Sequence, residues 1–163
     1  MGAFRDQSWS TRYTAMGDAA EAQCVAWLDS NDRGWVRYVL DRPPLRMSML
    51  PEFIRHTPDF LTSHSLVECK GFGRDQLGKI KLADWASLIS WHKLHPVELF
   101  FYDQHNERCI VVPFDKLHQV LAHRDKRIQK DQFNDDPPKP YWAFPADLLA
   151  ELGETHGSIT TEA

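Results

Sequence analysis

The spacing of hydrophobic and polar positions along the chain predicts an α/β protein. Segments rich in helix formers, or with apolar residues three and four positions apart, predict helices at 16–30, 76–94 and 114–123. Short apolar runs bounded by turn residues predict strands at 35–40, 56–61, 66–71, 97–102 and 108–113. The order along the chain is therefore helix, three strands, helix, two strands, helix.

The C-terminal part of the chain follows a different pattern. Residues 135–140 predict an extended linker, and the aromatic patch at 141–145 is expected to pack back onto the domain or onto a partner. A short helix is predicted at 147–152, and the end of the chain from about Glu154 is expected to be disordered. The predicted division of the chain is an N-terminal arm (1–15), one domain (16–132) and a proline-rich and aromatic extension (133–163).

Composition narrows the class of protein. The 163 residues are 42% hydrophobic, which is enough for one domain with a substantial core. No apolar run is long enough to cross a bilayer and the first residues carry no secretory pattern, so we expect no membrane association and a cytoplasmic location. Cys24, Cys69 and Cys109 lack metal-site spacing, which predicts buried free thiols.

The two strands at 56–61 and 66–71 carry the most informative polar residues. If Ser63 and His64 form the turn between them, Asp59 stands opposite Glu68 and both side chains share one face of the hairpin. Lys70 lies two positions further along the same strand and projects from that face as well.

Two opposed carboxylates repel and destabilise a hairpin by roughly 0.2–1 kcal/mol, unless a cation lies between them. Mg²⁺ prefers carboxylate oxygens and retains waters that can serve as nucleophiles. The sequence alone leaves open an ordinary solvated strand face.

The predicted first helix offers a further acid. Glu21 lies on or beside the apolar stripe of this helix, next to Cys24, Val25 and Leu28. A carboxylate in that position is costly unless it is paired or binds a metal, so Glu21 is a candidate site residue. The alternative is a partly exposed helix residue near a lysine.

Pro58-Asp59 followed by Glu68-Cys69-Lys70 within a hairpin resembles the signature of the PD-(D/E)XK nuclease superfamily. The resemblance implies a restriction-endonuclease-like core with a central mixed sheet flanked by helices. It further implies Mg²⁺, replaceable by Mn²⁺, held by Asp59, Glu68, the Cys69 main-chain carbonyl and Glu21. Lys70 would orient or help to deprotonate the attacking water. In such nucleases the helix after the hairpin and its loop often bind the substrate, which makes candidates of Arg74, Gln76, Lys79 and Lys81.

Within the superfamily, the chain is similar to small phage-type endonucleases, including resolvases that cut Holliday junctions. The similarity implies a metal-dependent endodeoxyribonuclease selective for branched DNA, with DNA as partner and a homodimer as assembly. Two alternatives stay open: an exonuclease acting on DNA ends or single strands in repair or phage DNA processing, and a non-catalytic nuclease-fold module.

Charge departs from the pattern of the resolvases, which are basic. The chain has 19 basic and 23 acidic residues, a net charge of −4. Basic residues do gather at 33–55 and 123–130, and either group could contact phosphates. The overall acidity favours transient engagement of a nucleic acid over tight non-specific binding.

Overall fold

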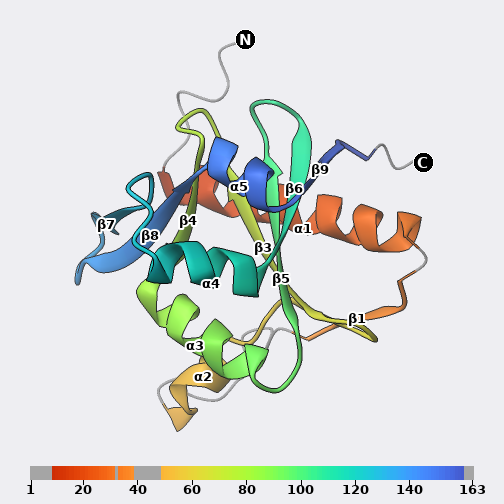
Figure 1. The fold of residues 1–163 in the computed structure, drawn as a ribbon, viewed down its shortest axis with the longest axis horizontal. Helices are drawn as coiled ribbons and strands as arrows, with labels where there is room; N and C mark the ends of the chain where they lie inside the picture. The colour runs from red at the N-terminus through yellow and green to blue at the C-terminus, as the bar shows by residue number, and fades with distance from the viewer. Residues whose placement is uncertain (1–8, 32, 39–48, 160–163) are drawn as a thin grey trace.

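A six-stranded mixed sheet forms the centre of the molecule in the computed structural model, which describes residues 9–31, 33–38 and 49–159 (Figure 1). β3 and β5 run parallel, and every other neighbouring pair in this sheet is antiparallel. The strands, in their order across the sheet, are β1 (Trp35–Arg37), β2 (Phe60–Thr62), β3 (Leu66–Phe72), β5 (Val97–Asp103), β6 (Arg108–Pro113) and β9 (Glu154–Gly157).

A second, three-stranded antiparallel sheet lies beside the first. Its order is β4 (Leu77–Lys81), β8 (Lys139–Pro145) and β7 (Gln129–Phe133). β4 follows β3 directly along the chain, so the second sheet begins where the central strand of the first sheet ends. This connection is what places the second sheet next to the hairpin residues.

Helices cover both faces of the central sheet. The long helix α1 (Trp9–Ser30) packs through Trp27 and Leu28 against Val67 and Cys69 of β3. Because side chains alternate along a strand, Leu66 and Phe72 of β3 belong to a different core cluster. That second cluster is built with α3 (Leu82–His92), α4 (Phe114–Ala122) and α5 (Ala146–Leu152), and the short helix α2 (Glu52–Arg55) lies against α3.

Most of the predicted elements are confirmed. α1 contains the helix predicted at 16–30, and α4 matches the helix predicted at 114–123. The strands predicted at 66–71, 97–102 and 108–113 are confirmed, and β1 covers the first half of 35–40, whose last two residues lie outside the described part of the chain. The strand predicted at 56–61 is wrong in its first part, because β2 begins only at Phe60 and Asp59 lies in the bend that precedes it. The coarse prediction of an α/β fold with a mixed sheet flanked by helices is therefore correct.

The helix predicted at 76–94 is wrong in its first part. Residues 77–81 form β4, and α3 begins only at Leu82. Gly78 and Ile80 are buried while Leu77, Lys79 and Lys81 are half-buried, which is the period-two pattern of a strand. Lys79 and Lys81 therefore project from a strand and not from the first turns of a helix.

The C-terminal segment completes both sheets. β8 takes in the last two residues of the predicted linker and the aromatic patch, and Phe144 and Leu148 are fully buried in the core. The short predicted helix is α5, whereas Glu154–Gly157, expected to be disordered, pairs with β6 as β9. Among the helices in the described ranges, none is long and apolar enough to cross a membrane.

Candidate active site

The β2–β3 hairpin has the register that the sequence predicts. Phe60 pairs with Val67 and Leu61 with Leu66, and the Thr62 N–H donates to the Ser65 carbonyl over 2.8 Å. The Ser65 N–H in turn donates to the Thr62 hydroxyl oxygen over 2.9 Å, which fixes the turn. Continuing the same register by one step sets Asp59 opposite Glu68.

Pro58 interrupts the ladder at the next hydrogen-bonding position. Thr62 with Ser65 and Phe60 with Val67 are hydrogen-bonding pairs, so Pro58 with Cys69 would be the following one. Proline has no N–H, so β2 has no donor to offer to the Cys69 carbonyl. The Cys69 N–H donates instead to the Asp59 carboxylate over 2.7 Å. The chain thereby directs a main-chain oxygen and a carboxylate toward the same opening beside β3.

Glu68 and Lys70 belong to a charged network that crosses from β3 to α3. The Lys70 ammonium donates to Glu68 over 2.5 Å and lies 3.5 Å from the carboxylate of Asp84. Asp84, in the first turn of α3, also pairs with His56 Nδ1 over 2.7 Å. Neither Asp84 nor His56 was among the site residues predicted from the sequence.

Burial and mutual repulsion perturb the acids of this network. Burial raises the pKa of Glu68 to about 8, and the nearby carboxylates of Asp59 and Asp84 act in the same direction, against Lys70. Burial likewise raises the pKa of Asp59, despite Lys70 and the hydrogen bond from the Cys69 N–H. Asp84 differs: its burial is outweighed by Lys70 and His56, and its pKa falls to about 2. The site therefore gathers three acids around one lysine, and burial favours the neutral form of two of them.

Lys70 is held in its charged form. Burial works against the ammonium, but the surrounding carboxylates, Glu68 first and then Asp84 and Asp59, raise its pKa well above the usual range. A lysine with a raised pKa is a poor general base and a good electrostatic stabiliser of developing negative charge.

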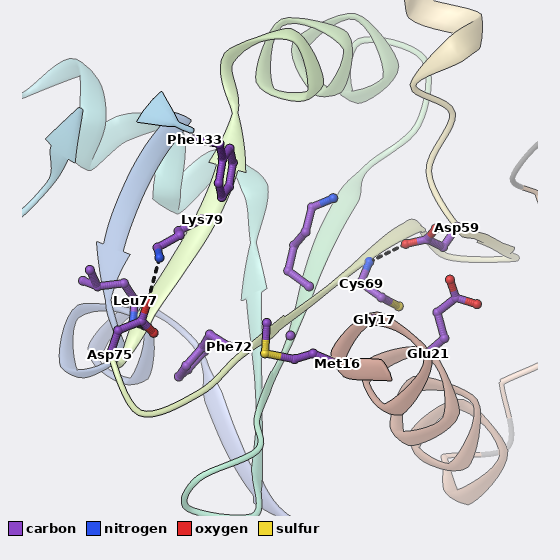
Figure 2. A pocket seen from close by; sticks show the side chains of 12 residues that line it. Met16, Gly17, Glu21, Asp59, Cys69, Phe72, Asp75, Leu77, Lys79 and Phe133 are labelled. Atoms are coloured by element: carbon purple, nitrogen blue, oxygen red, sulfur yellow. Dashed lines mark hydrogen bonds and ion pairs between the residues drawn. The ribbon is translucent and has the colours of Figure 1, made fainter. Parts of the chain in front are cut away.

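Glu21 approaches the hairpin from α1. Its carboxylate pairs with Arg37 of β1 over 2.8 Å. Burial raises the pKa of Glu21, and the nearby charge of Asp59 acts in the same direction. In Figure 2 the Glu21 side chain extends from α1 toward Asp59. The sequence-based assignment of Glu21 to the neighbourhood of Asp59 therefore agrees with its position.

The close seating of α1 on β3 depends on a glycine. A Cβ atom at Gly71 would lie 2.7 Å from the carbonyl oxygen of Met16 and 2.9 Å from its side chain, which is closer than atoms can approach. Helix and strand therefore touch through backbone at this point. Glu21, little more than one turn further along α1, is carried toward the strand by this contact.

A cleft of about 240 Å³ opens beside these residues (Figure 2). One side is formed by Glu21 of α1, by Cys69 of β3 and by Asp59, which precedes β2; Lys70 of β3 also lines the cleft. The other side is formed by the second sheet and carries Lys79 and Phe133.

The four predicted substrate-binding residues divide into two groups. Lys79 lines the cleft, where its ammonium pairs with Asp75 over 2.6 Å. Lys81 projects from the same face of β4 and lowers the pKa of Asp84, but it is not among the described residues that line the cleft. Arg74 and Gln76 are not among the described residues that line the cleft. Gln76 instead donates to the buried carboxylate of Asp103 over 2.9 Å, which is a structural role in the adjoining loops.

The basic groups expected to meet phosphates are partly neutralised within the protein. Arg33 pairs with Glu98 over 2.7 Å, and Arg37 with Glu21. In the second basic segment Arg127 pairs with Asp125 and also with Glu151. These contacts explain how an acidic chain accommodates its arginines. Lys70 and Arg37 both lower the pKa of Asp59.

The donor set for a metal is small. Among the residues that the structure describes, no group of three or more His, Cys, Asp or Glu side chains could hold a metal ion. Mg²⁺ is commonly bound by one or two carboxylates, with water and substrate phosphate completing its shell. Asp59 and Glu68, with the Cys69 carbonyl that β2 leaves without a donor, match that mode of binding.

Comparison with known proteins gives no relative: no family model, no curated protein and no solved structure matches the chain.

Proposed function

We propose that the chain is a metal-dependent endodeoxyribonuclease of the PD-(D/E)XK type, built on a restriction-endonuclease-like core. The observation that carries the proposal is that Asp59, Glu68 and Lys70 lie close enough beside β3 to perturb one another's charges, with the Asp59 carboxylate bonded to the Cys69 N–H. A network of buried acids with raised pKa values is costly for stability, and such networks cluster at functional sites.

Mg²⁺, or Mn²⁺ in its place, would be held by Asp59, Glu68 and the Cys69 main-chain carbonyl, with Glu21 at its outer side. Bound there, the metal would polarise the scissile phosphate and activate water. The raised pKa values of Asp59, Glu68 and Glu21 support this assignment, because a divalent cation favours the ionised forms that burial disfavours.

Lys70 would stabilise negative charge on the phosphate and orient the attacking water. Its raised pKa favours this role over abstraction of a proton from water. Asp84 would hold the ammonium from the opposite side to Glu68, so that the lysine remains extended along β3 toward the cleft. Proton removal would then fall to solvent or to the substrate.

The proposed partner is DNA, and the proposed setting is the cytoplasm, with a homodimer for symmetric cuts in branched DNA. The buried acidic network disfavours a non-catalytic module, since a protein that only binds has no use for such a cluster. An exonuclease acting on ends or single strands is the second candidate. The observation that favours it is the aromatic and basic wall that Phe133 and Lys79 of the second sheet form along the cleft.

Asp59→Asn is the sharpest test, because asparagine keeps the oxygen that accepts from the Cys69 N–H and loses only the negative charge. We expect Mg²⁺-dependent cleavage of labelled DNA by the wild-type chain, none in EDTA, and a loss of at least about 100-fold in the variant. The matched control is Asp115→Asn, an exposed position in the first turn of α4, which should retain wild-type cleavage. Equal cleavage by both variants would refute the assignment of the site.

A further inference from the structure

The second sheet has two faces with different chemistry. Gly78, Ile80 and Phe144 point into the core, so the alternate residues of β4 and β8 lie on the opposite face. The pairing Lys79 with Ala143 and Lys81 with Tyr141 assigns both lysines and the tyrosine to this outer face. In β7, Asp131 pairs with Tyr141 and Phe133 with Lys139, which adds Phe133 and a third lysine.

Contacts within this face order its aromatic and basic groups. The rings of Phe133 and Tyr141 lie 4.3 Å apart between centroids, tilted by 44°. The Lys79 ammonium lies 5.5 Å from the centre of the Tyr141 ring. Tyr141 is buried beneath them, whereas Phe133 is only half-buried and lines the cleft together with Lys79. The cleft wall thus presents one aromatic side chain on a rigid base, with an ammonium group beside it.

This wall faces the proposed catalytic residues. Figure 2 shows Phe133 and Lys79 across the cleft from Asp59 and Glu21. A nucleotide whose phosphate reached Lys70 would therefore have the second sheet on its other side. Lysines binding the backbone and an aromatic ring accepting a base are the recurring means by which proteins bind single strands.

We propose that the outer face of the second sheet binds unpaired DNA nucleotides and selects single strands, frayed ends or flaps over intact duplex. The reason is geometric: the faces of bases inside a duplex are covered by their neighbours, so only an unstacked base can pack on the Phe133 side chain. Lys79 then binds the adjoining phosphate in exchange for Asp75. The inference rests on the proposed nuclease function and names its substrate class.

The opposite face of the same ribbon supplies a matched control. Lys130 of β7 pairs with Trp142, and its ammonium lies 5.8 Å from that ring, on the face turned away from Tyr141 and Phe133. Lys130→Ala removes an exposed lysine and one positive charge from the same strand pair without altering the cleft. Because Lys130 belongs to the basic group at 123–130, this variant also tests whether that group binds the DNA in place of the cleft wall. Non-specific attraction of DNA to the ribbon would weaken in this variant as much as in Lys79→Ala.

The test measures binding separately from cleavage. Fluorescence anisotropy in EDTA and at low salt would compare a labelled oligodeoxythymidylate with a labelled blunt duplex of the same length. We expect the wild-type chain to bind the single strand more tightly. Phe133→Leu, which keeps apolar cover over Tyr141, should weaken that binding about 5- to 100-fold. Lys79→Ala should also weaken it, whereas Lys130→Ala should leave it unchanged.

Two outcomes overturn the proposal: equal or tighter binding of the blunt duplex by the wild-type chain, or single-strand binding that Phe133→Leu and Lys130→Ala affect equally. Cleavage assays in Mg²⁺ with the same oligonucleotides then separate this proposal from the proposed function. Binding that depends on Phe133 without any metal-dependent cutting would refute the nuclease and leave the single-strand surface standing. Metal-dependent cutting of duplex that does not depend on Phe133 would support the nuclease and refute the single-strand surface.

Discussion

Replacing Glu68 by glutamine tests the electrostatics of the site without requiring activity. Glu68 is 8% exposed, and burial raises its pKa from 4.5 to about 8. Between these two values the folded chain holds a proton on Glu68 that the unfolded chain has released. The wild-type free energy of unfolding should therefore be highest below about pH 4.5 with respect to this group, and should decline as the pH rises to about 8.

The magnitude follows from the width of that window. One proton contributes at most about 1.4 kcal/mol for each pH unit, so a window of about 3.5 units sets a ceiling of about 5 kcal/mol. Relaxation of the site and entry of water around the ionised carboxylate lower this cost, so we expect ~2–3 kcal/mol. Lys70 and Asp84 do not titrate within this window, because the pKa of Lys70 lies above its usual range and that of Asp84 is about 2. Asp59 and Glu21 have raised pKa values and add a decline of the same sign.

Urea denaturation in EDTA from about pH 5 to about pH 8.5 provides the measurement. Glutamine can still accept the hydrogen bond from Lys70 and cannot ionise, so the Glu68→Gln variant should gain stability relative to wild type as the pH rises. Glu151→Gln, at an exposed position, is the control and should show a constant difference. A Glu68→Gln difference that stays constant across the same range would refute the reasoning about this network.

Three further predictions concern single contacts. Asp84→Asn removes the second carboxylate beside Lys70, the proposed catalytic lysine, and kcat/KM for DNA cleavage should fall roughly 10- to 100-fold with circular dichroism unchanged. A wild-type rate would contradict this. Pro58→Ala restores an N–H opposite the Cys69 carbonyl, and this N–H would compete with a metal for the carbonyl oxygen. The Mg²⁺ concentration for half-maximal cleavage should therefore rise roughly tenfold. An unchanged concentration would show that this carbonyl does not bind metal. Gly78→Ala should lower the free energy of unfolding by about 1–3 kcal/mol, because the added Cβ would lie 2.7 Å from an aromatic ring atom. Gly17→Ala is the control and should not lower it, since nothing lies within 4 Å of that position. Equal urea midpoints for the Gly78 variant and wild type would contradict the prediction.

The hairpin could be predicted because its information is local. A polar turn and the alternation of strand side chains suffice to set Asp59 opposite Glu68, and both are visible in ten consecutive residues. The effect of Pro58 is also local, because proline has no N–H to donate to a neighbouring strand in any fold. The charges that converge there needed no knowledge of the rest of the fold.

The segment after the hairpin could not be predicted in the same way. Leu77, Ile80 and the apolar residues of α3 fit a helical period, and only pairing with β8, more than fifty residues later, makes 77–81 a strand. The position of Asp84 depends on where that strand ends, since the first turn of α3 is thereby aimed at Lys70. Phe133 enters the cleft through the same long-range pairing. The periodicity of one segment cannot predict the position of Asp84 or of Phe133.

The contact between Gly71 and Met16 gives the site a mechanical property as well as an electrostatic one. Glu21 and Asp59 stand on different layers, and the spacing of those layers near the cleft is set where backbone meets backbone. A side chain at position 71 would push the start of α1 away from β3 and move Glu21 away from Asp59, although no charged residue of the site had been replaced. The distance between Glu21 and Asp59 therefore depends on Gly71, a residue that has no side chain.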